Sequence, residues 1–137
     1  MTEKPEELRI LALVPQEKQE QVGRQVASLG AKIDFVNNAS ELSHLALTRN
    51  SYHVALLPAA LPDNGWWSLW GELAVLHPRP EILVYAPMAS FRLWSGVLEM
   101  GGYDVIVEPF TDEDLQRAIL RAATSFKERC LTENTND

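Results

Sequence analysis

Short apolar runs alternate along this chain with segments in which apolar residues recur at helical spacing. The runs are nearly continuous in apolar character, which is typical of parallel strands covered by helices on both faces. Five runs are predicted to be strands: Leu8 to Val14, Lys32 to Val36, Val54 to Leu57, Ile82 to Ala86 and Tyr103 to Val107.

The segments between and after these runs repeat apolar residues every three or four positions, which predicts amphipathic helices. The five apolar sets are Val22, Val26 and Leu29; Leu42, Leu45 and Ala46; Leu69, Leu73 and Leu76; Phe91, Trp94, Val97 and Leu98; and Leu115, Ala118, Ile119, Ala122 and Phe126. Asn38 with Glu41, and Thr111 with Asp114, have the spacing of a capping box at a helix start. Gly30 follows the first helix, where a left-handed residue commonly ends a helix.

Strict alternation of strand and helix predicts an α/β protein with right-handed crossovers and a doubly wound parallel sheet. In such sheets, ligands bind at the carboxyl ends of the strands, where the strand order reverses. The loops that follow the predicted strands are therefore the places to look for chemistry.

The length of 137 residues fits one domain, predicted over residues 8–127 with polar tails at 1–7 and 128–137. The formal net charge of −7 argues against binding to nucleic acid or to an anionic membrane surface, because both need clustered Lys and Arg. No apolar run approaches the roughly 20 residues that span a bilayer. The single cysteine, Cys130, fits a reducing compartment, so we expect a cytoplasmic protein.

The segment from Gly101 to Leu115 resembles the last strand and the start of the last helix in response-regulator receiver domains. In that family the segment reads Gly-Ala, a short apolar strand, Lys-Pro-Phe and an acidic helix start. Here it reads Gly-Gly, an apolar strand, Glu-Pro-Phe and Thr-Asp-Glu-Asp. The resemblance covers about residues 8–127 and implies a flavodoxin-like three-layer sandwich with a five-stranded parallel sheet in the order 2-1-3-4-5.

The resemblance also identifies the positions of the family's phosphorylation pocket, and each of them is changed in this chain. Pro15 and Gln16 stand where an acidic pair would hold a divalent cation, and Pro58 stands where the phosphoacceptor aspartate would be. Glu108 replaces the family's lysine, so the charge at that position is reversed. A carboxylate there would repel a phosphoryl oxygen.

The two remaining pocket positions are also altered. The hydroxyl position at the end of the fourth strand falls on Ala86 by spacing to Gly101, or on Tyr85 if the alignment shifts by one residue. The family's switch aromatic falls on Val105. The resemblance therefore supports the fold while the substitutions argue against phosphorylation.

Tryptophan is the most unusual positive feature, and two interpretations of it stay open. Trp66, Trp67 and Trp70 cluster at the start of the third predicted helix, and Trp94 lies in the fourth. The side chains either fill the empty phosphate pocket or form a patch for a partner, because exposed Trp and Arg are enriched in interface hot spots. The candidate interaction surface consists of Trp66, Trp67, Trp70, Trp94, Arg92, Arg117 and Arg121. By resemblance, a homodimer through the fourth helix, fifth strand and fifth helix is one possible use of it.

Other chemistries have weaker support. The three histidines, His44, His53 and His77, are scattered along the sequence. A carboxylate set at the crevice would consist of Glu17, Asp63 and Glu108. A helix start, a turn or a surface position accounts for each of these acids separately. A flavin site would need a glycine- or hydroxyl-rich loop after the first strand, where this chain has Pro-Gln-Glu-Lys. We therefore expect no enzyme activity, metal or cofactor.

The function predicted from the sequence is that of a receiver-like domain that lacks the phosphoacceptor. It would act as a phosphorylation-independent interaction module for another signalling protein or an output domain. The alternatives are a small-ligand sensor that uses the crevice beside Pro58 and Glu108, and a true receiver with relocated acids.

Overall fold

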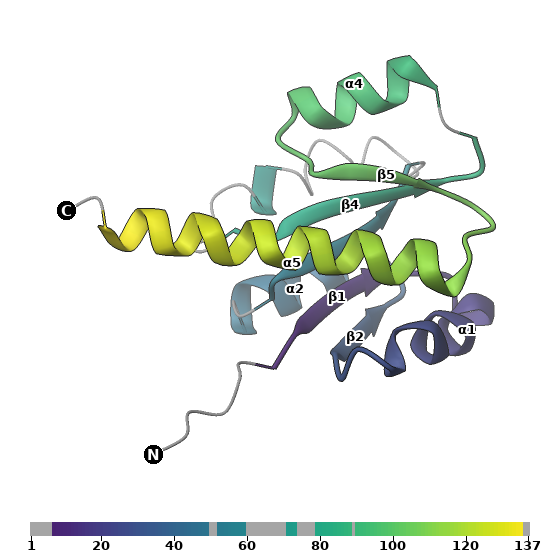
Figure 1. Ribbon diagram of the computed structural model, residues 1–137. Helices are drawn as coiled ribbons and strands as arrows, with labels where there is room; N and C mark the ends of the chain where they lie inside the picture. Colours follow the sequence, from purple (N-terminus) through teal and green to yellow (C-terminus); the bar gives the residue numbers. More distant parts are fainter. Residues whose placement is uncertain (1–6, 50–51, 60–70, 74–78, 89, 136–137) are drawn as a thin grey trace.

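The computed structural model describes residues 7–49, 52–59, 71–73, 79–88 and 90–135. Its five strands are β1 (Arg9–Leu13), β2 (Lys32–Val36), β3 (Val54–Pro58), β4 (Glu81–Ala86) and β5 (Asp104–Val107). They form one parallel sheet in the order β2-β1-β3-β4-β5, as predicted (Figure 1). All five predicted strands are confirmed, with ends that differ by no more than one residue.

The helices are α1 (Gln16–Ala27), α2 (Ala39–Arg49), α4 (Phe91–Glu99) and α5 (Asp112–Thr135). Residues 71–73 are also helical, but most of the third predicted helix lies outside the described residues. None of the helices in the described part of the chain has the length and apolar character needed to cross a membrane.

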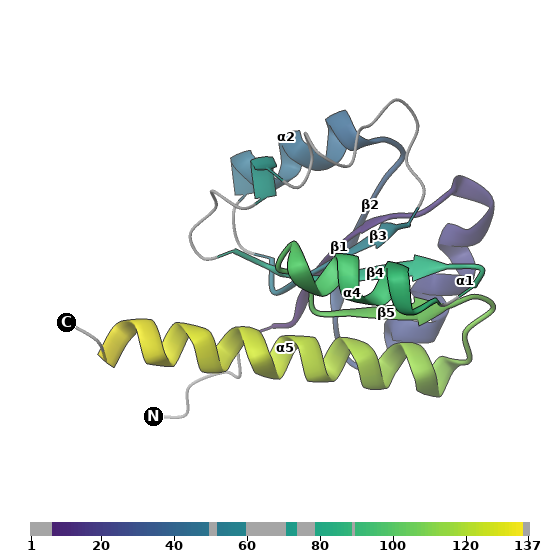
Figure 2. The ribbon, with the colours of Figure 1, turned by 90° about the horizontal axis from the view of Figure 1, so that it is seen from above.

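The helices cover the two faces of the sheet in separate layers (Figure 2). Because side chains alternate along a strand, successive residues of β1, β3 and β4 enter different cores. One core contains Leu11, Leu13, Ala55, Leu57, Ile82 and Val84 with residues of α2 and α4. The other contains Ile10, Ala12, Val54, Leu56, Leu83 and Tyr85 with residues of α1 and α5. The central strands are thus buried on both sides, which explains their nearly continuous apolar sequence.

The local signals that mark the helix ends are confirmed in detail. The Asn38 side chain accepts a hydrogen bond from the backbone N–H of Glu41 at 2.9 Å, and Thr111 Oγ1 accepts one from Asp114 N–H at 3.1 Å. The Glu41 carboxylate reaches back one residue further than expected, to the N–H of Asn37. Gly30 has a φ of 67°, the left-handed conformation expected after the first helix.

The apolar stripe predicted for α4 is divided between the core and the solvent, which corrects the prediction. Val97 is buried, whereas Phe91, Trp94 and Leu98 are exposed. The inner face of the helix is completed by Leu93 and Met100, which pack against the same core. A second apolar set with helical spacing, Leu93, Val97 and Met100, therefore faces the sheet.

The segment predicted to be a polar tail from residue 128 is helical as far as Thr135, because α5 continues to that residue and extends past the strands in Figure 1. Side-chain contacts hold this extension against the start of β4. Arg129 forms an ion pair with Glu81 at 3.1 Å and donates a hydrogen bond to the Arg79 carbonyl at 2.6 Å. Ser125 donates to the same Glu81 carboxylate. A segment that looked like a solvated tail therefore has specific partners in the domain.

Candidate functional site

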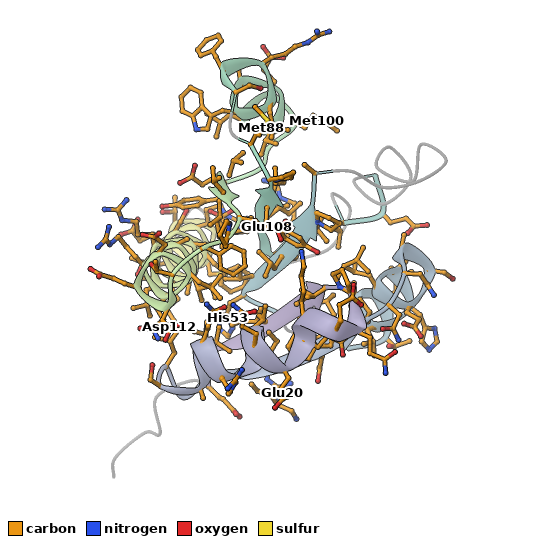
Figure 3. The ribbon with its side chains drawn as sticks, turned by 90° about the vertical axis from the view of Figure 1, so that its right-hand side faces the viewer. Glu20, His53, Met88, Met100, Glu108 and Asp112 are labelled. Atoms are coloured by element: carbon orange, nitrogen blue, oxygen red, sulfur yellow. The ribbon has the colours of Figure 1, made fainter. Side chains whose placement is uncertain are left out.

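The carboxyl ends of β3, β4 and β5 bring three of the predicted pocket positions to one edge of the sheet. Pro58 is paired with Tyr85, and Ala86 is paired with Val107. The backbone N–H of Glu108 donates to the Ala86 carbonyl at 2.8 Å. Figure 3 views this edge, with Glu108 near the ends of the strands. Pro58, Ala86 and Glu108 therefore share the edge at which a doubly wound sheet binds ligands.

Pro58 is the last residue of β3 and is partly buried. A proline inside a central strand would remove a hydrogen bond from the ladder, because it has no N–H. At the strand end, the next residue supplies the donor, since Ala59 N–H bonds to the Tyr85 carbonyl at 2.8 Å. Pro58 thus fits the backbone at the strand end, and its side chain is a saturated ring without a polar atom.

Pro15 and Gln16 lie at the start of α1, directly after β1. Pro15 has a φ of −54° and its carbonyl accepts a hydrogen bond from Lys18 N–H at 2.8 Å, so it fits the beginning of a helix. Both side chains are exposed, and neither carries a charge. The edge therefore receives no carboxylate from these two positions.

Tyr85 makes a buried connection across the sheet that the sequence did not reveal. Its hydroxyl donates to the Leu13 carbonyl at 2.7 Å, from β4 over β3 to the end of β1. Its ring meets Phe110 edge to face at a centroid distance of 6.5 Å. Burial, and to a lesser extent the negative charge of Glu108, raises the pKa of the phenol, so Tyr85 stays neutral. This hydroxyl is committed to structure, and Ala86 beside it presents only a buried methyl group.

Glu108 is joined to α1 by an ion pair that was also missed. Lys18 Nζ lies 2.7 Å from Glu108 Oε2, with side-chain exposures of 49% and 20% respectively. The two residues are 90 positions apart, and they connect the first turn of α1 with the loop after β5. One signal was present in the sequence, because a lysine in the first turn of a helix opposes the helix dipole and often has another partner.

A groove lies beside this ion pair, between α1 and the loops that follow β4 and β5. It has a volume of about 360 Å³ and is lined by Lys18, Gln21, Val22, Pro87, Glu108, Pro109 and Phe110. The apolar residues come from all three segments, and charges of both signs stand at Lys18 and Glu108. Pro58 is not among the lining residues, so the groove covers only part of the predicted crevice.

The described residues contain no group of three or more His, Cys, Asp or Glu side chains that could hold a metal ion. Glu17 lies exposed in the first turn of α1, and Glu108 faces Lys18. Asp63, the third carboxylate of the predicted set, lies outside the described residues. The geometry of that set therefore stays a prediction.

Two of the three histidines lie in the described part of the chain, and they are far apart in the fold. His44 is exposed on α2. His53 is buried at the entry to β3, where its Nδ1 accepts a hydrogen bond from Arg9 N–H at 3.1 Å and its ring meets Phe126 edge to face. His77 lies outside the described residues.

The predicted interaction surface is divided between two helices. Arg92 and Trp94 are exposed on α4, and Trp94 lies 6.1 Å from the Phe91 ring. Arg117 and Arg121 are exposed on α5, in the opposite helical layer, and Arg117 pairs with Glu113 at 2.6 Å. Trp66, Trp67 and Trp70 lie outside the described residues, so both interpretations of that cluster stay open. The exposure of Phe91 beside Trp94, and that of Met88 before the start of α4, was not anticipated.

Comparison with known proteins agrees with the fold. No protein-family model matches the chain. The transcriptional regulatory protein CusR of Escherichia coli K12 is 27% identical over 107 residues, which are 77% of this chain and 47% of CusR. The same protein of E. coli O6:H1 matches equally. The chain thus spans about half the length of the curated relatives it matches.

Solved structures give the same answer at lower sequence identity. The signal receiver domain of a proposed LuxO repressor protein from Vibrio parahaemolyticus has a TM-score of 0.80 and 14% identity, covering 93% of this chain and 98% of that one. A CheY-like response regulator receiver domain from Methanospirillum hungatei has a TM-score of 0.76 and 18% identity, covering 90% and 99%. The fold is therefore the receiver fold.

The buried Tyr85 bond can be tested with Tyr85→Phe, which removes only the hydroxyl. We expect a loss of about 1 kcal/mol in the free energy of unfolding, measured with urea at neutral pH, because the Leu13 carbonyl loses a buried partner. Since the pKa of Tyr85 is raised in the folded state, the unfolded phenol ionises first. Wild-type stability should fall as the pH rises above about 10, and the variant should lose less over that range. Equal pH profiles for the two proteins would contradict this assignment.

The Lys18–Glu108 pair can be tested by a double-mutant cycle with Lys18→Met and Glu108→Gln. Because the pair is partly exposed, we expect a coupling energy of about 0.5 kcal/mol, obtained from urea unfolding. The coupling should shrink in 1 M salt, where screening is stronger. A coupling of zero at low salt would show that the contact is not formed in solution.

Proposed function

We propose that this chain, which has the fold of response-regulator receiver domains, is a signalling module that works without phosphorylation. The observation that carries the proposal is Pro58 at the carboxyl end of β3, paired with Tyr85 in the position where receivers keep their acceptor aspartate. The other positions of the edge also differ from the receiver pattern. Pro15 and Gln16 are uncharged where receivers have acids, and Glu108 is a carboxylate where they have a lysine.

Phosphoryl capture by a receiver needs a carboxylate nucleophile and a divalent cation that neutralises the developing charge. The proline ring of Pro58 has no oxygen that could attack phosphorus. Without acids at Pro15 and Gln16, a hard cation would lack the oxygen ligands it prefers. Glu108 would add a negative charge where a lysine would stabilise the phosphoryl group. Each change weakens a different component, so restoring one of them would not restore the reaction.

The Lys18–Glu108 pair supports a constitutive form of the domain. In place of a site that changes charge on modification, the edge contains a pair that is already neutral overall. The hydroxyl of Tyr85 is likewise bonded to Leu13. We infer that the domain keeps one conformation. It would transmit a signal through a constant contact with a partner protein, without a change of conformation on modification.

A surface for such binding is available on α4, where apolar side chains face solvent. Phe91 and Trp94 are exposed with Arg92 on α4, and Met88 is exposed before the start of the helix; apolar residues with arginine are typical of protein interfaces. The partner we propose is another signalling protein or an output domain, since the match covers only 47% of the curated relatives. Receiver domains are generally non-enzymatic, and we propose the same for this one. The net charge of −7 disfavours nucleic acid and anionic membranes as partners of this domain. We also propose a cytoplasmic location.

A second candidate function is that of a small-ligand sensor, because a groove of about 360 Å³ lies beside Lys18 and Glu108. That volume is at the lower end of the range for small-molecule sites, roughly 300–1,000 Å³. Its charges would suit a ligand that carries an acidic and a basic group. The Glu108→Gln variant would weaken such binding without affecting a protein contact on α4.

The proposed function predicts that the protein gains no phosphoryl group from acetyl phosphate in the presence of Mg²⁺. Intact-protein mass spectrometry checks this, with a receiver domain that retains its acceptor aspartate as the positive control. The Pro58→Asp variant should also stay unmodified, because the cation ligands and the lysine are still missing. A stoichiometric gain of one phosphoryl group by the wild-type protein would contradict the proposal.

A further inference from the structure

We propose that the free edge of β2 pairs with β2 of a second copy of this chain, antiparallel, so that two sheets join into one. The two-fold axis passes through Ile33, and Lys32 of each copy faces Asp34 of the other. This contact goes beyond the proposed function, which concerns the carboxyl ends of the strands and the surface of α4. It does not depend on whether the domain can be phosphorylated.

The strand β2 ends the sheet on the side opposite β5, as Figure 1 shows. Its ladder to β1 runs from Lys32 to Val36. Lys32 is exposed, and Ile33, Asp34 and Phe35 are partly exposed. An accessible edge strand is a place where a strand of another chain can be added to a sheet.

The backbone of β2 presents hydrogen-bonding groups along this edge. The N–H of Lys32 donates to the Leu8 carbonyl at 2.8 Å, so the backbone of Lys32 points toward β1. The direction alternates along a strand, so the N–H and C=O groups of Ile33 and Phe35 point the other way, toward the free edge. Within the described part of the chain, no loop or helix supplies backbone bonds to these two residues.

The charges on β2 are self-complementary. Lys32 and Asp34 are two residues apart, so their side chains leave the strand on the same face. Charged residues on an edge strand hinder pairing with a second copy when like charges meet. An antiparallel pair centred on Ile33 instead places Lys32 of each copy opposite Asp34 of the other, which makes two equivalent ion pairs. A pair centred on either charged residue would place identical charges opposite each other.

The backbone direction agrees with the register that the charges select. With the axis at Ile33, the outward N–H and C=O of Ile33 exchange both hydrogen bonds with Ile33 of the second copy. Phe35 then lies opposite Ala31. Lys32 and Asp34 fall at the non-hydrogen-bonded positions, where opposite Cα atoms approach to about 4.5 Å and side chains are closest. Two independent features of the strand thus favour one arrangement.

The two charged side chains can form this contact without losing another ion pair. Within the part of the chain that the structure describes, Lys32 takes part in no salt bridge. Asp34 Oδ2 accepts a hydrogen bond from the hydroxyl of the buried Tyr52 at 2.5 Å, which orients the carboxylate. A carboxylate has about four acceptor sites, so Asp34 can bond to Tyr52 and to a lysine together.

A contact between two edge strands is small, so we expect a weak dimer. Its area should fall below the roughly 1,200 Å² at the lower limit of stable interfaces. Because β2 is already ordered within the sheet, the pairing does not have to order a free strand. We expect a dissociation constant on the order of 100 µM.

The first test is amide hydrogen exchange, measured by NMR at protein concentrations of about 20 µM and about 1 mM. The amides of Ile33 and Phe35 should exchange about fourfold more slowly at the higher concentration, because the dimer fraction then rises and the dimer protects them. The amide of Lys32 is bonded to Leu8 in the monomer, so it should be protected at both concentrations.

The second test is sedimentation equilibrium of two charge reversals, Lys32→Asp and Asp34→Lys. Each variant alone places like charges at both contacts, so its dissociation constant should rise at least about tenfold. An equimolar mixture of the two should associate about as tightly as the wild-type protein, because both contacts are then complementary. Arg92→Asp and Glu99→Lys, at exposed positions on α4, make matched charge changes away from β2 and should leave association unchanged.

Asp34→Lys also removes the acceptor of the Tyr52 hydroxyl, so circular dichroism must show that this variant is folded. If it is not folded, Lys32→Asp still decides the question, because it should abolish the concentration dependence of the Ile33 and Phe35 amides. Three outcomes would overturn the β2 pair: exchange rates that do not depend on concentration, association of Lys32→Asp as tight as that of the wild type, or a folded mixture that does not associate. Weaker association of the α4 controls alone would place the contact on α4 and would equally refute it.

Discussion

The parallel pairing of β1, β3, β4 and β5 is the constraint on which the account of this protein depends. It brings the carboxyl ends of these strands to one edge, so a residue that follows any of them can act on the same small volume. Pro58 and Ala86 occupy that edge as the last residues of β3 and β4, and Glu108 is fixed to it by a backbone hydrogen bond. The fold therefore brings Pro58, Ala86 and Glu108 to one edge, where Glu108 is the one of these three residues that carries a carboxylate.

The residues at the changed positions are each accommodated by contacts with the surrounding structure. Glu108 would be costly at this edge beside an acidic cluster, but here it faces Lys18 at 2.7 Å. Tyr85 would lose hydrogen bonds on burial, but its hydroxyl is bonded to the Leu13 carbonyl. Pro58 would break the ladder within a strand, but it stands at the strand end, where Ala59 supplies the donor. These contacts make the edge a structural part of the domain.

The strands and helix starts could be predicted from the sequence because each depends on a short local pattern of residues. Buried strands such as Val54–Pro58 have almost no polar residue, and the helix starts at Asn38 and Thr111 have their caps within three residues. Packing choices between equivalent faces could not be read in this way. The two apolar stripes of α4 have the same period, so only the tertiary contacts of Val97 decide which one is inside. The same holds for the last turns of α5. Their sequence is polar, and the ion pair between Arg129 and Glu81 depends on the tertiary fold.

The site was predictable as a set of positions but not as a set of contacts. The resemblance to receivers places Pro58, Ala86 and Glu108 by alignment alone. The partners of Tyr85 and Glu108 are 72 and 90 residues away in sequence, and no local pattern connects them. Long-range pairs of this kind follow from the strand order, which is why they became visible only with the fold.

The most direct test of the central claim is a titration of the isotopically labelled protein with Mg²⁺ and beryllium fluoride, a mimic of a bound phosphoryl group. Backbone amide signals of Ala59, Ala86 and Glu108 report on the edge in heteronuclear NMR spectra. The account predicts that these three signals stay where they are at millimolar concentrations of both reagents. Saturable shifts of all three signals, dependent on both reagents together, would show that the edge still binds a phosphoryl group and would contradict it.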